Sequence, residues 1–241
     1  MTLPTILTIV STAIFFAAER LVPGRPLPAS RGWYARALLV NLAQLGITLA
    51  TGKSWPLVFG GRSSLFSLSS WQSPALAGFV AWFVGTFFYY WWHRIRHLRG
   101  FWRVFHQIHH SPARIEILTS FYKHPVEIGI NALLSALILY PLLGCSLLAA
   151  FWYNFFAATG EYFYHANLRS PRWLRLLIQT PELHSIHHQY GVHAFNYGDI
   201  PLWDRLFGTV RAAPQFAERC GFDDGAEQRL GEMLLFRDVS G

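Results

Sequence analysis

The stretch PALAGFVAWFVGTFFYYWWHRIRH, residues 74–97, joins an apolar run to a pair of histidines. Its apolar part, 74–92, is close to the roughly 20 residues that an α-helix needs to cross the hydrocarbon core of a bilayer. His93 and His97 follow at once, and their i, i+4 spacing puts both imidazoles on one helical face. The stretch therefore predicts a membrane-spanning helix that ends in a metal-binding pair.

Four further apolar runs of similar length lie at 3–18, 37–60, 126–143 and 146–164. The first run lacks a basic n-region and a cleavage site, so we expect a retained span and not a signal peptide. The last two runs are joined only by the region of Gly144. They form either two spans or a tight hairpin in which one run is interfacial. The predicted fold class is an all-α, integral membrane helical bundle of four to five spans.

The composition agrees with a membrane protein. Hydrophobic residues make up 52% of the chain and charged residues 14%, and the ten Trp and ten Tyr are residue types enriched at lipid headgroups. The net charge of +7 resides in short connections beside the apolar runs. This pattern favours an anionic membrane surface as partner and predicts no nucleic acid. Cys145 and Cys220 lack the spacing of a metal site or a disulfide framework.

The basic residues also predict an orientation. Four arginines make the segment 20–36 basic, whereas the second loop has little beyond Lys53 and Arg62. Because short basic loops stay in the cytoplasm, the first loop is expected inside and the N-terminus outside. The third span then delivers the basic segment 94–123 to the cytoplasm, and the chain after His165 returns there. We therefore predict a histidine-rich site on the cytoplasmic side, in a bacterial inner membrane.

Histidines carry the chemical information. All eleven lie between residues 93 and 193, and two groups share the pattern H-x-x-H-H, namely HQIHH at 106–110 and HSIHH at 184–188. On a helix the positions i, i+3 and i+4 converge, so each triplet is expected to present three nitrogen donors to one side. Two triplets and the pair at 93 and 97 supply eight donors, too many for one zinc ion and about right for two metals. Apolar residues interleave them, unlike in irregular metal-scavenging tracts.

Three histidines stand alone. His165 ends an apolar run that delivers it to the same membrane face as the groups, so it is expected to be a ligand. His124 precedes Pro125 and is either a ligand or a turn residue bonded to backbone. His193 is expected to support the site or the fold. The predicted metal ligands are His93, His97, His106, His109, His110, His124, His165, His184, His187 and His188.

The identity of the metal follows less directly, because imidazole binds Zn, Cu, Fe and Ni alike. A closed zinc site needs four ligands and no membrane, whereas two redox-active irons with neutral ligands can reduce dioxygen at the bilayer boundary. The donor count favours two non-haem irons. Five carboxylates are candidates to hold ligand N–H groups or to bind metal: Glu127, Glu161, Glu182, Asp199 and Asp204. For Asp204, a salt bridge with Arg205 is the favoured interpretation.

Three regions are predicted: N-terminal transmembrane helices and a loop at 1–73, a catalytic domain at 74–211, and a polar surface tail at 212–241. The last region is polar, contains glycine and has no long apolar period. The chain has no G-x-G-x-x-G or Walker pattern, so electrons for a redox reaction are expected from a separate donor.

Over roughly residues 82–209 the chain resembles the fatty acid hydroxylase/sterol desaturase superfamily of integral-membrane di-iron proteins. The residues that carry the resemblance are YYWWHR at 89–94 with His97, FHQIHHS at 105–111, KHP at 123–125 with Glu127, HAN at 165–167, HSIHH at 184–188, NYG at 196–198 and WDRLFGT at 203–209. The resemblance implies an iron pair, hydroxylation or desaturation of an unactivated C–H bond of a lipid, and an external donor such as a ferredoxin, a cytochrome b5-like protein or a pterin. The single histidine at 165 resembles the sterol-desaturase and alkylglycerol-monooxygenase-like branches. It leaves open whether His124 or Glu161 completes the ligand set.

The predicted function is thus a membrane-bound, non-haem di-iron oxygenase that uses O2 to hydroxylate or desaturate a lipid. A membrane metal transporter would place ionisable residues along the spans, near mid-bilayer. Here the histidines gather at one interface instead. A zinc-dependent lipid hydrolase is the other alternative, and its activity would not depend on oxygen.

Overall fold

The structure is a computed structural model that describes residues 1–59, 63–212 and 215–240. It is a bundle of helices with no strand in these ranges, which confirms the all-α prediction. The long helices are α1 (Leu3–Leu21), α2 (Trp33–Phe59), α3 (Pro74–Arg96), α6 (Pro125–Leu137) and α7 (Leu147–His165). Gly60, the predicted end of the second run, lies outside the described residues, as do 213, 214 and 241 of the predicted tail.

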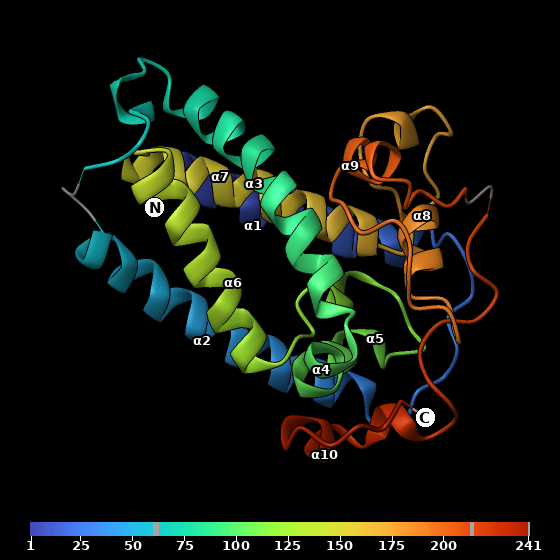
Figure 1. The fold of residues 1–241 in the computed structure, drawn as a ribbon. Helices are drawn as coiled ribbons and strands as arrows, with labels where there is room; N and C mark the ends of the chain where they lie inside the picture. Colours follow the sequence, from blue (N-terminus) through green and yellow to red (C-terminus); the bar gives the residue numbers. More distant parts are fainter. Residues whose placement is uncertain (60–62, 213–214, 241) are drawn as a thin grey trace.

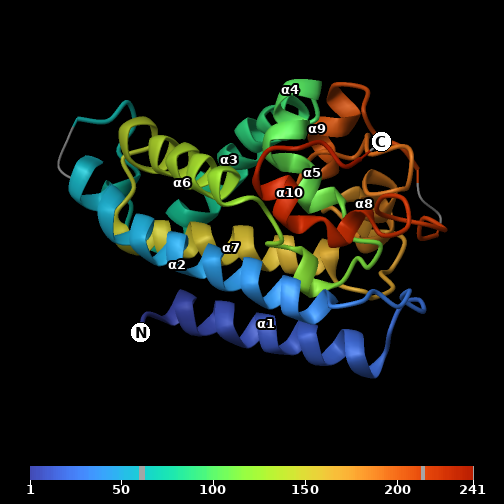
Figure 2. The same cartoon turned by 90° about the horizontal axis from the view of Figure 1, so that it is seen from below.

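Short helical elements complete the chain. They are η1 (Leu68–Ser70), α4 (Arg99–Phe101), the π-helix η2 (Trp102–His106), α5 (Gln107–His110), η3 (Ile117–Thr119), the π-helix η4 (Ile138–Leu142), η5 (Leu174–Leu176), α8 (Pro181–His187), α9 (Pro201–Leu206), η6 (Ala226–Gln228) and α10 (Leu230–Leu234). In Figures 1 and 2 the long helices extend away on one side, whereas α4, α5, α8, α9 and α10 gather at the other end.

Local sequence signals define where the long helices begin. Ser73 and Ser146 cap α3 and α7, because each hydroxyl accepts a hydrogen bond from the backbone N–H three residues later, at 3.2 Å. Pro74 occupies the first turn of α3, where proline needs no hydrogen-bond partner. The ring of His124 caps α6, since its Nδ1 accepts from the N–H of Val126 at 3.1 Å. These caps fix the ends of the helices that carry the candidate ligands.

Among the residues that the structure describes, three helical segments are long and apolar enough to cross a bilayer: Leu3–Leu21, Pro74–Arg96 and Pro125–Leu142. The last is α6 with its π-helical continuation η4. Many of their large apolar side chains face outward, such as Ile14, Phe79 and Leu133, at 59%, 43% and 38% exposure. Lipid-facing surfaces of this kind are expected of a membrane bundle. The count of four to five spans remains a prediction.

Close packing of α3 against α7 sets the frame of the bundle. Gly78 of α3 lies so near α7 that a Cβ built there would be 2.4 Å from the Cβ of Trp152 and 2.6 Å from the carbonyl oxygen of Ala149. Ala81 and Ala149 are fully buried in the same contact. Small residues let the two backbones approach each other, as at helix contacts within membranes. The contact aligns the ends of α3 and α7, where His93 and His165 lie.

The C-terminal segment is not wholly a surface tail. Leu230, Met233 and Val239 are buried in one apolar cluster with Trp33 of α2 and Ile108 of α5. The side chain of Gln107 extends this contact, because its Nε2 donates to the carbonyl oxygen of Arg237 and its Oε1 accepts from the N–H of Val239. The C-terminal segment therefore covers the helix that carries His109 and His110. The division of the chain into three regions remains a prediction.

The α3–α7 contact yields a test with an internal control. We expect Gly78→Ala to destabilise the protein by about 2 kcal/mol, because the added methyl group overlaps α7. Gly160→Ala, on α7 itself, meets no atom within 4 Å and keeps or raises stability, since alanine favours a helix over glycine. Thermal unfolding of both variants in detergent, followed by tryptophan fluorescence, measures the difference. Equal melting temperatures would contradict the packing described.

Candidate metal centre

Nine of the ten predicted ligands converge in two groups. The five-histidine group consists of His93, His97, His106, His110 and His187. The four-histidine group consists of His109, His165, His184 and His188. Within each group, one candidate ligand atom from every residue lies within 4.8 Å of the others. The side chains come from the ends of α3 and α7 and from the short helices between and after them.

The Nε2 atoms of the five-histidine group are free to bind a metal. All five are buried and have no hydrogen-bond partner within the described ranges. The opposite ring nitrogens are engaged: Nδ1 of His93 donates to the carbonyl oxygen of Tyr197, and Nδ1 of His187 to that of Phe195, both at 2.7 Å. A proton on Nδ1 leaves a lone pair on Nε2. Five buried lone pairs that face one point fit a metal ion and little else.

The four-histidine group also gathers its Nε2 atoms. Nε2 of His165 lies 3.3 Å from that of His109 and 2.9 Å from that of His184, and Nε2 of His188 lies 3.1 Å from that of His184. Nδ1 of His165 donates to the carbonyl oxygen of Glu161 at 2.9 Å, which leaves a lone pair on its Nε2. These donors fit a second metal ion.

The two groups are neighbours, and each triplet contributes to both. The ring of His110, in the first group, stacks on that of His188, in the second, with centroids 4.2 Å apart. From the first triplet His109 turns to the four-histidine group, while from the second triplet His187 turns to the five-histidine group. The expectation that each triplet faces one side as a unit is therefore wrong, because the i+3 histidine diverges from the other two.

Burial keeps the imidazoles neutral. It lowers the pKa of His187 to about 3 and holds the pKa values of His97, His110 and His188 well below their usual range. Neighbouring histidines act in the same direction, since a second positive charge nearby disfavours protonation. Neutral imidazole is the form that binds metals.

A strained loop supplies the carbonyl groups that orient two ligands. His193, Phe195 and Asn196 have φ angles of 41°, 69° and 49°, in the left-handed region that non-glycine residues seldom adopt. The side chain of Asn196 holds the loop in place through hydrogen bonds to the backbones of Leu183 and Arg211. Backbone strain of this kind persists where the surroundings fix it, often at functional sites. In the sequence, the only sign of this loop was the pattern NYG at 196–198, which belongs to the motifs of the family resemblance.

The carboxylates fulfil different roles. Glu127 lies 3.1 Å from Nδ1 of His106 and pairs with Arg96, so it supports a candidate ligand as expected. The carboxylate of Glu161 pairs with Lys123 at 2.6 Å and accepts from the hydroxyl of Tyr164 at 2.7 Å. Among the described residues it belongs to neither histidine group.

The favoured salt bridge between Asp204 and Arg205 is wrong. Asp204 is buried and accepts hydrogen bonds from the backbone N–H groups of Tyr197 and Gly198, both at 2.8 Å. Arg205 points the other way and donates to the carbonyl oxygens of Leu176 and Arg175. Adjacent helical residues point in different directions, which separates the two charges. Asp204 thereby fixes the loop whose carbonyl groups orient His93 and His187.

His124 and His193 belong to neither histidine group. His124 is not part of either group; it caps α6, and its ring packs 5.0 Å from that of Phe236. Its proposed role as a ligand therefore remains a prediction, without support from this geometry. Nδ1 of His193 lies 3.2 Å from Nδ1 of His110, which is a supporting position.

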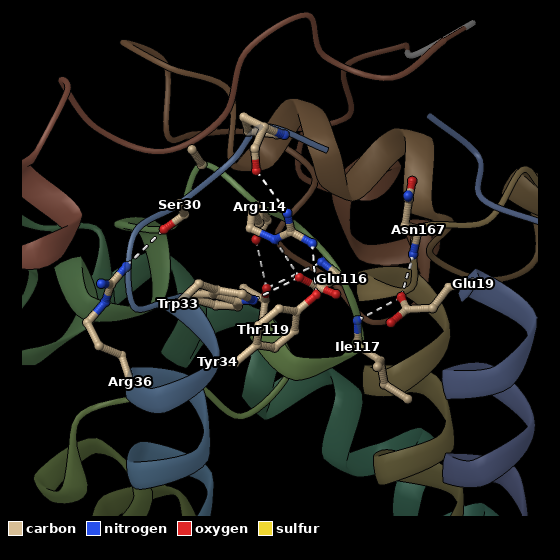
Figure 3. A network of polar contacts seen from close by, with 12 residues as sticks. Glu19, Ser30, Trp33, Tyr34, Arg36, Arg114, Glu116, Ile117, Thr119 and Asn167 are labelled. Atoms are coloured by element: carbon tan, nitrogen blue, oxygen red, sulfur yellow. Dashed lines mark hydrogen bonds and ion pairs between the residues drawn. The ribbon is translucent and has the colours of Figure 1, made fainter. Parts of the chain in front are cut away.

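A buried polar network ties α1 to the segments that follow two ligands (Figure 3). Glu19, only 3% exposed, accepts hydrogen bonds from the backbone N–H groups of Ile117 and Asn167, both at 3.0 Å. Ile117 follows the helix of His109 and His110, and Asn167 follows His165. Sequence reasoning missed Glu19, because a lone carboxylate in an apolar run gives no sign of what it contacts.

A second carboxylate extends this network. Glu116 accepts from the indole N–H of Trp33 at 2.8 Å and pairs with Arg114 and Arg20. The network therefore joins α1, α2 and the loop after α5 behind the histidines. Buried carboxylates need such partners, because an unpaired buried charge is costly.

A helical bundle with candidate membrane spans and two adjacent groups of buried histidines defines a membrane metalloprotein rich in histidine ligands. The chain belongs to the fatty acid hydroxylase family, whose model matches residues 78–209, more than half of its length. This confirms the superfamily that the motifs predicted.

Several characterised relatives act on lipids. The chain is 33% identical to methylsterol monooxygenase 2-2 of Arabidopsis thaliana over 47% of its length and 43% of the relative's. It is 31% identical to the ornithine lipid hydroxylase OlsE of Rhizobium tropici over 55% of the chain and 41% of the relative. Human alkylglycerol monooxygenase is 29% identical over 61% of the chain and 33% of that protein. The matches thus span less than half of these relatives. No solved structure is significantly similar.

The division into two groups predicts which pairs of substitutions remove which metal. Alanine at both His97 and His187 removes two donors from the five-histidine group alone, so we expect one metal ion per chain to remain. Alanine at both His187 and His188 removes a donor from each group and is expected to lower the content of both metals. Metal analysis of the detergent-purified variants measures this.

The matched control for metal content is His124→Asn, which keeps a side chain able to cap α6. Because His124 lies outside both groups, this variant should bind as much metal as the parent chain. Equal losses in the two double variants would refute the division, and loss in His124→Asn would make His124 a ligand.

The network around Glu19 predicts a loss of stability. Glu19→Ala leaves two buried backbone N–H groups without an acceptor, at a cost of about 2–5 kcal/mol. Glu232→Ala is the matched control, since Glu232 forms an exposed pair with Arg229 and its removal should leave the melting temperature unchanged. Thermal unfolding compares the variants, and similar melting temperatures would show that the network contributes little.

Proposed function

We propose that this chain is a membrane-bound, non-haem di-iron oxygenase that uses O2 and an external electron donor to hydroxylate, or desaturate, a lipid. One observation carries the proposal: two adjacent groups of buried, neutral histidines gather their Nε2 atoms at two points, and those of the five-histidine group have no hydrogen-bond partner among the described residues. Family membership supports the same chemistry.

The donor set supports iron as the metal. Nine neutral nitrogens and no thiolate suit a first-row transition metal such as iron. When bound, the iron pair supplies the activation of O2 that oxidation of an unactivated C–H bond requires. The ligands proposed are the nine histidines of the two groups, and the candidates for a tenth are His124 and Glu161.

The protein's own residues prepare the centre. The carbonyl groups of Phe195 and Tyr197 fix the tautomer and the orientation of His187 and His93. Glu127 does the same for His106. Burial of the imidazoles excludes water from the ligand shell and keeps them unprotonated, so the centre stays competent for metal at neutral pH.

A lipid is the proposed substrate. The relatives are named for methylsterols, ornithine lipids and alkylglycerols, which are all amphipathic molecules of membranes. The three candidate spans among the described residues support a membrane environment for this chain as well. A substrate taken from the bilayer would reach the centre without crossing water.

The electron donor and the side of the membrane are proposed from charge. We place the centre on the cytoplasmic side of a bacterial inner membrane, because the basic connections lie beside the histidine-bearing segments. Exposed arginines such as Arg99 and Arg103, close to the π-helix of His106, would attract an acidic carrier such as a ferredoxin. A cytochrome b5-like protein or a pterin would serve the same purpose.

Metal content and lipid products test the proposal together. The purified protein should contain about two irons per chain, with the spectroscopic signature of a non-haem pair. Lipid extracts of cells that produce it should contain a lipid with one added oxygen atom, or one lacking two hydrogens, and the product should depend on O2. Mass spectrometry of these extracts measures both.

The variant with alanine at both His187 and His188 is the control, and it should lose iron and product alike. Stoichiometric zinc with lipid cleavage that proceeds without O2 would instead favour a hydrolase. Metal uptake into vesicles without lipid oxidation would favour a transporter.

A further inference from the structure

A group of exposed apolar side chains lies beyond the candidate spans. It is formed by η5 with its flanks and by α9, which lie side by side because Arg205 of α9 donates hydrogen bonds to the carbonyl oxygens of Arg175 and Leu176. We call this group the apolar platform: Trp173, Leu176, Leu177, Leu202, Leu206 and Phe207. Leu177 and Leu206 are 63% and 65% exposed. Leucine at 202 and 206 repeats at i, i+4, so both side chains lie on one face of α9. Apolar side chains gathered in this way usually mark a contact surface.

The platform is attached to a candidate span. Trp203 of α9 donates its indole N–H to the hydroxyl of Thr86 at 2.9 Å and packs against Phe87, with ring centroids 5.1 Å apart. Phe207 lies 4.8 Å from the ring of Trp91, which is itself 37% exposed. The apolar surface of α3 therefore continues directly onto α9. Figure 1 shows α9 beside the part of α3 that leads to the histidines.

This attachment fixes the level of the platform relative to the bilayer. Trp91, whose ring contacts Phe207, lies about 8 Å along the helix axis from Arg96, where α3 ends, at a rise of 1.5 Å per residue. With the end of α3 at the membrane surface, the end of α9 that carries Leu206 and Phe207 lies at the level of the headgroups and the adjoining acyl chains. Tryptophan and arginine are typical of that level, and both occur in the platform and its flanks.

The exposed charges around the platform are positive. The segment 169–211 contains five arginines and three acidic residues. All three acids are engaged within the fold: Glu182 accepts from Ser170, Asp199 from Tyr164, and Asp204 from the backbone of the 197–198 turn. Arg172 and Arg211 are exposed. A surface of leucine, tryptophan and arginine without a free carboxylate suits an anionic lipid leaflet.

We infer that the apolar platform is an interfacial membrane anchor that inserts its leucine and tryptophan side chains into a leaflet of acidic phospholipid. It adds a second membrane contact to the spanning helices. Since Asp204 of α9 fixes the loop that orients His93 and His187, this anchor holds the metal centre at the bilayer surface. The inference concerns the membrane contact and does not depend on which metal or reaction the centre supports.

Site-directed spin labelling in nanodiscs tests the anchor. Nitroxides are attached to Leu177→Cys and Leu206→Cys in the full chain, and their accessibility to O2 and to a water-soluble nickel chelate is measured. In discs that contain phosphatidylglycerol, both labels should be several-fold more accessible to O2 than to the chelate. The parent chain, whose Cys145 and Cys220 are buried, reports background labelling.

Two labelled variants calibrate the measurement. Leu133→Cys, on the outer face of α6, reports a position in lipid, and Asp224→Cys, whose parent side chain is fully exposed, reports water. Chelate accessibility at Leu177 and Leu206 equal to that at Asp224 would overturn the anchor. Dipolar broadening between labels of two chains, with both reagents excluded, would also overturn it in favour of a contact between copies.

The preference of the platform for acidic lipid is tested by changing the lipid and the charge of the protein. Replacing phosphatidylglycerol by phosphatidylcholine should raise chelate accessibility at Leu177, and Arg172→Gln should produce a similar rise in discs with phosphatidylglycerol. Accessibility that is unaffected by either change would overturn the preference for acidic lipid. Metal content, which these surface substitutions should not alter, reports whether the variants remain folded.

Discussion

The structure depends on the burial of nine imidazoles whose lone pairs face two points. A buried nitrogen without a partner is unfavourable by a few kcal/mol, so an arrangement with many of them requires compensation. A metal bound at the Nε2 atoms would supply that compensation, and the opposite nitrogens of His93, His106 and His187 are held by carbonyl groups or a carboxylate. Burial also keeps the rings neutral. One physical condition thus explains the tautomers of His93 and His187, the neutral state of the rings and the strained loop after α8.

The scaffold meets this condition by bringing helix ends together. Gly78 and Ala149 allow α3 and α7 to pack closely, so that His93 and His165 lie at the same end of the bundle. The N-terminal helix lies outside the residues matched by the family model, yet Glu19 ties the segments after α5 and after α7 to each other. The C-terminal segment closes the opposite side through Met233 and its neighbours. The ligand set therefore depends on both ends of the chain.

The membrane and the metal centre are coupled through α9. Its outer face carries Leu202 and Leu206, while its inner face carries Asp204, which accepts from the backbone of Tyr197 and Gly198. One face of this short helix is thus exposed, and the other holds the loop whose carbonyl groups orient His93 and His187. An enzyme that takes an amphipathic substrate from a bilayer needs its reactive centre at a fixed height above the acyl chains, and a helix of this kind supplies a rigid link.

The class of the fold, the family and the nine histidines that converge could all be predicted from the sequence, because apolar runs of bilayer length and repeated H-x-x-H-H spacing are local patterns. The sequence did not decide how the ligands divide. The i+3 residue of each triplet, His109 or His187, turns to the other group, since the direction of each ring depends on which helices surround it. Nor did it reveal that His124 caps α6, that Asp204 faces inward, or that Glu19 bridges two loops. Glu19 joins residues up to 148 positions apart, which only the packed tertiary structure brings together. The contacts of His124 and Asp204 span two to seven positions, but the direction in which each side chain points depends on the fold around it.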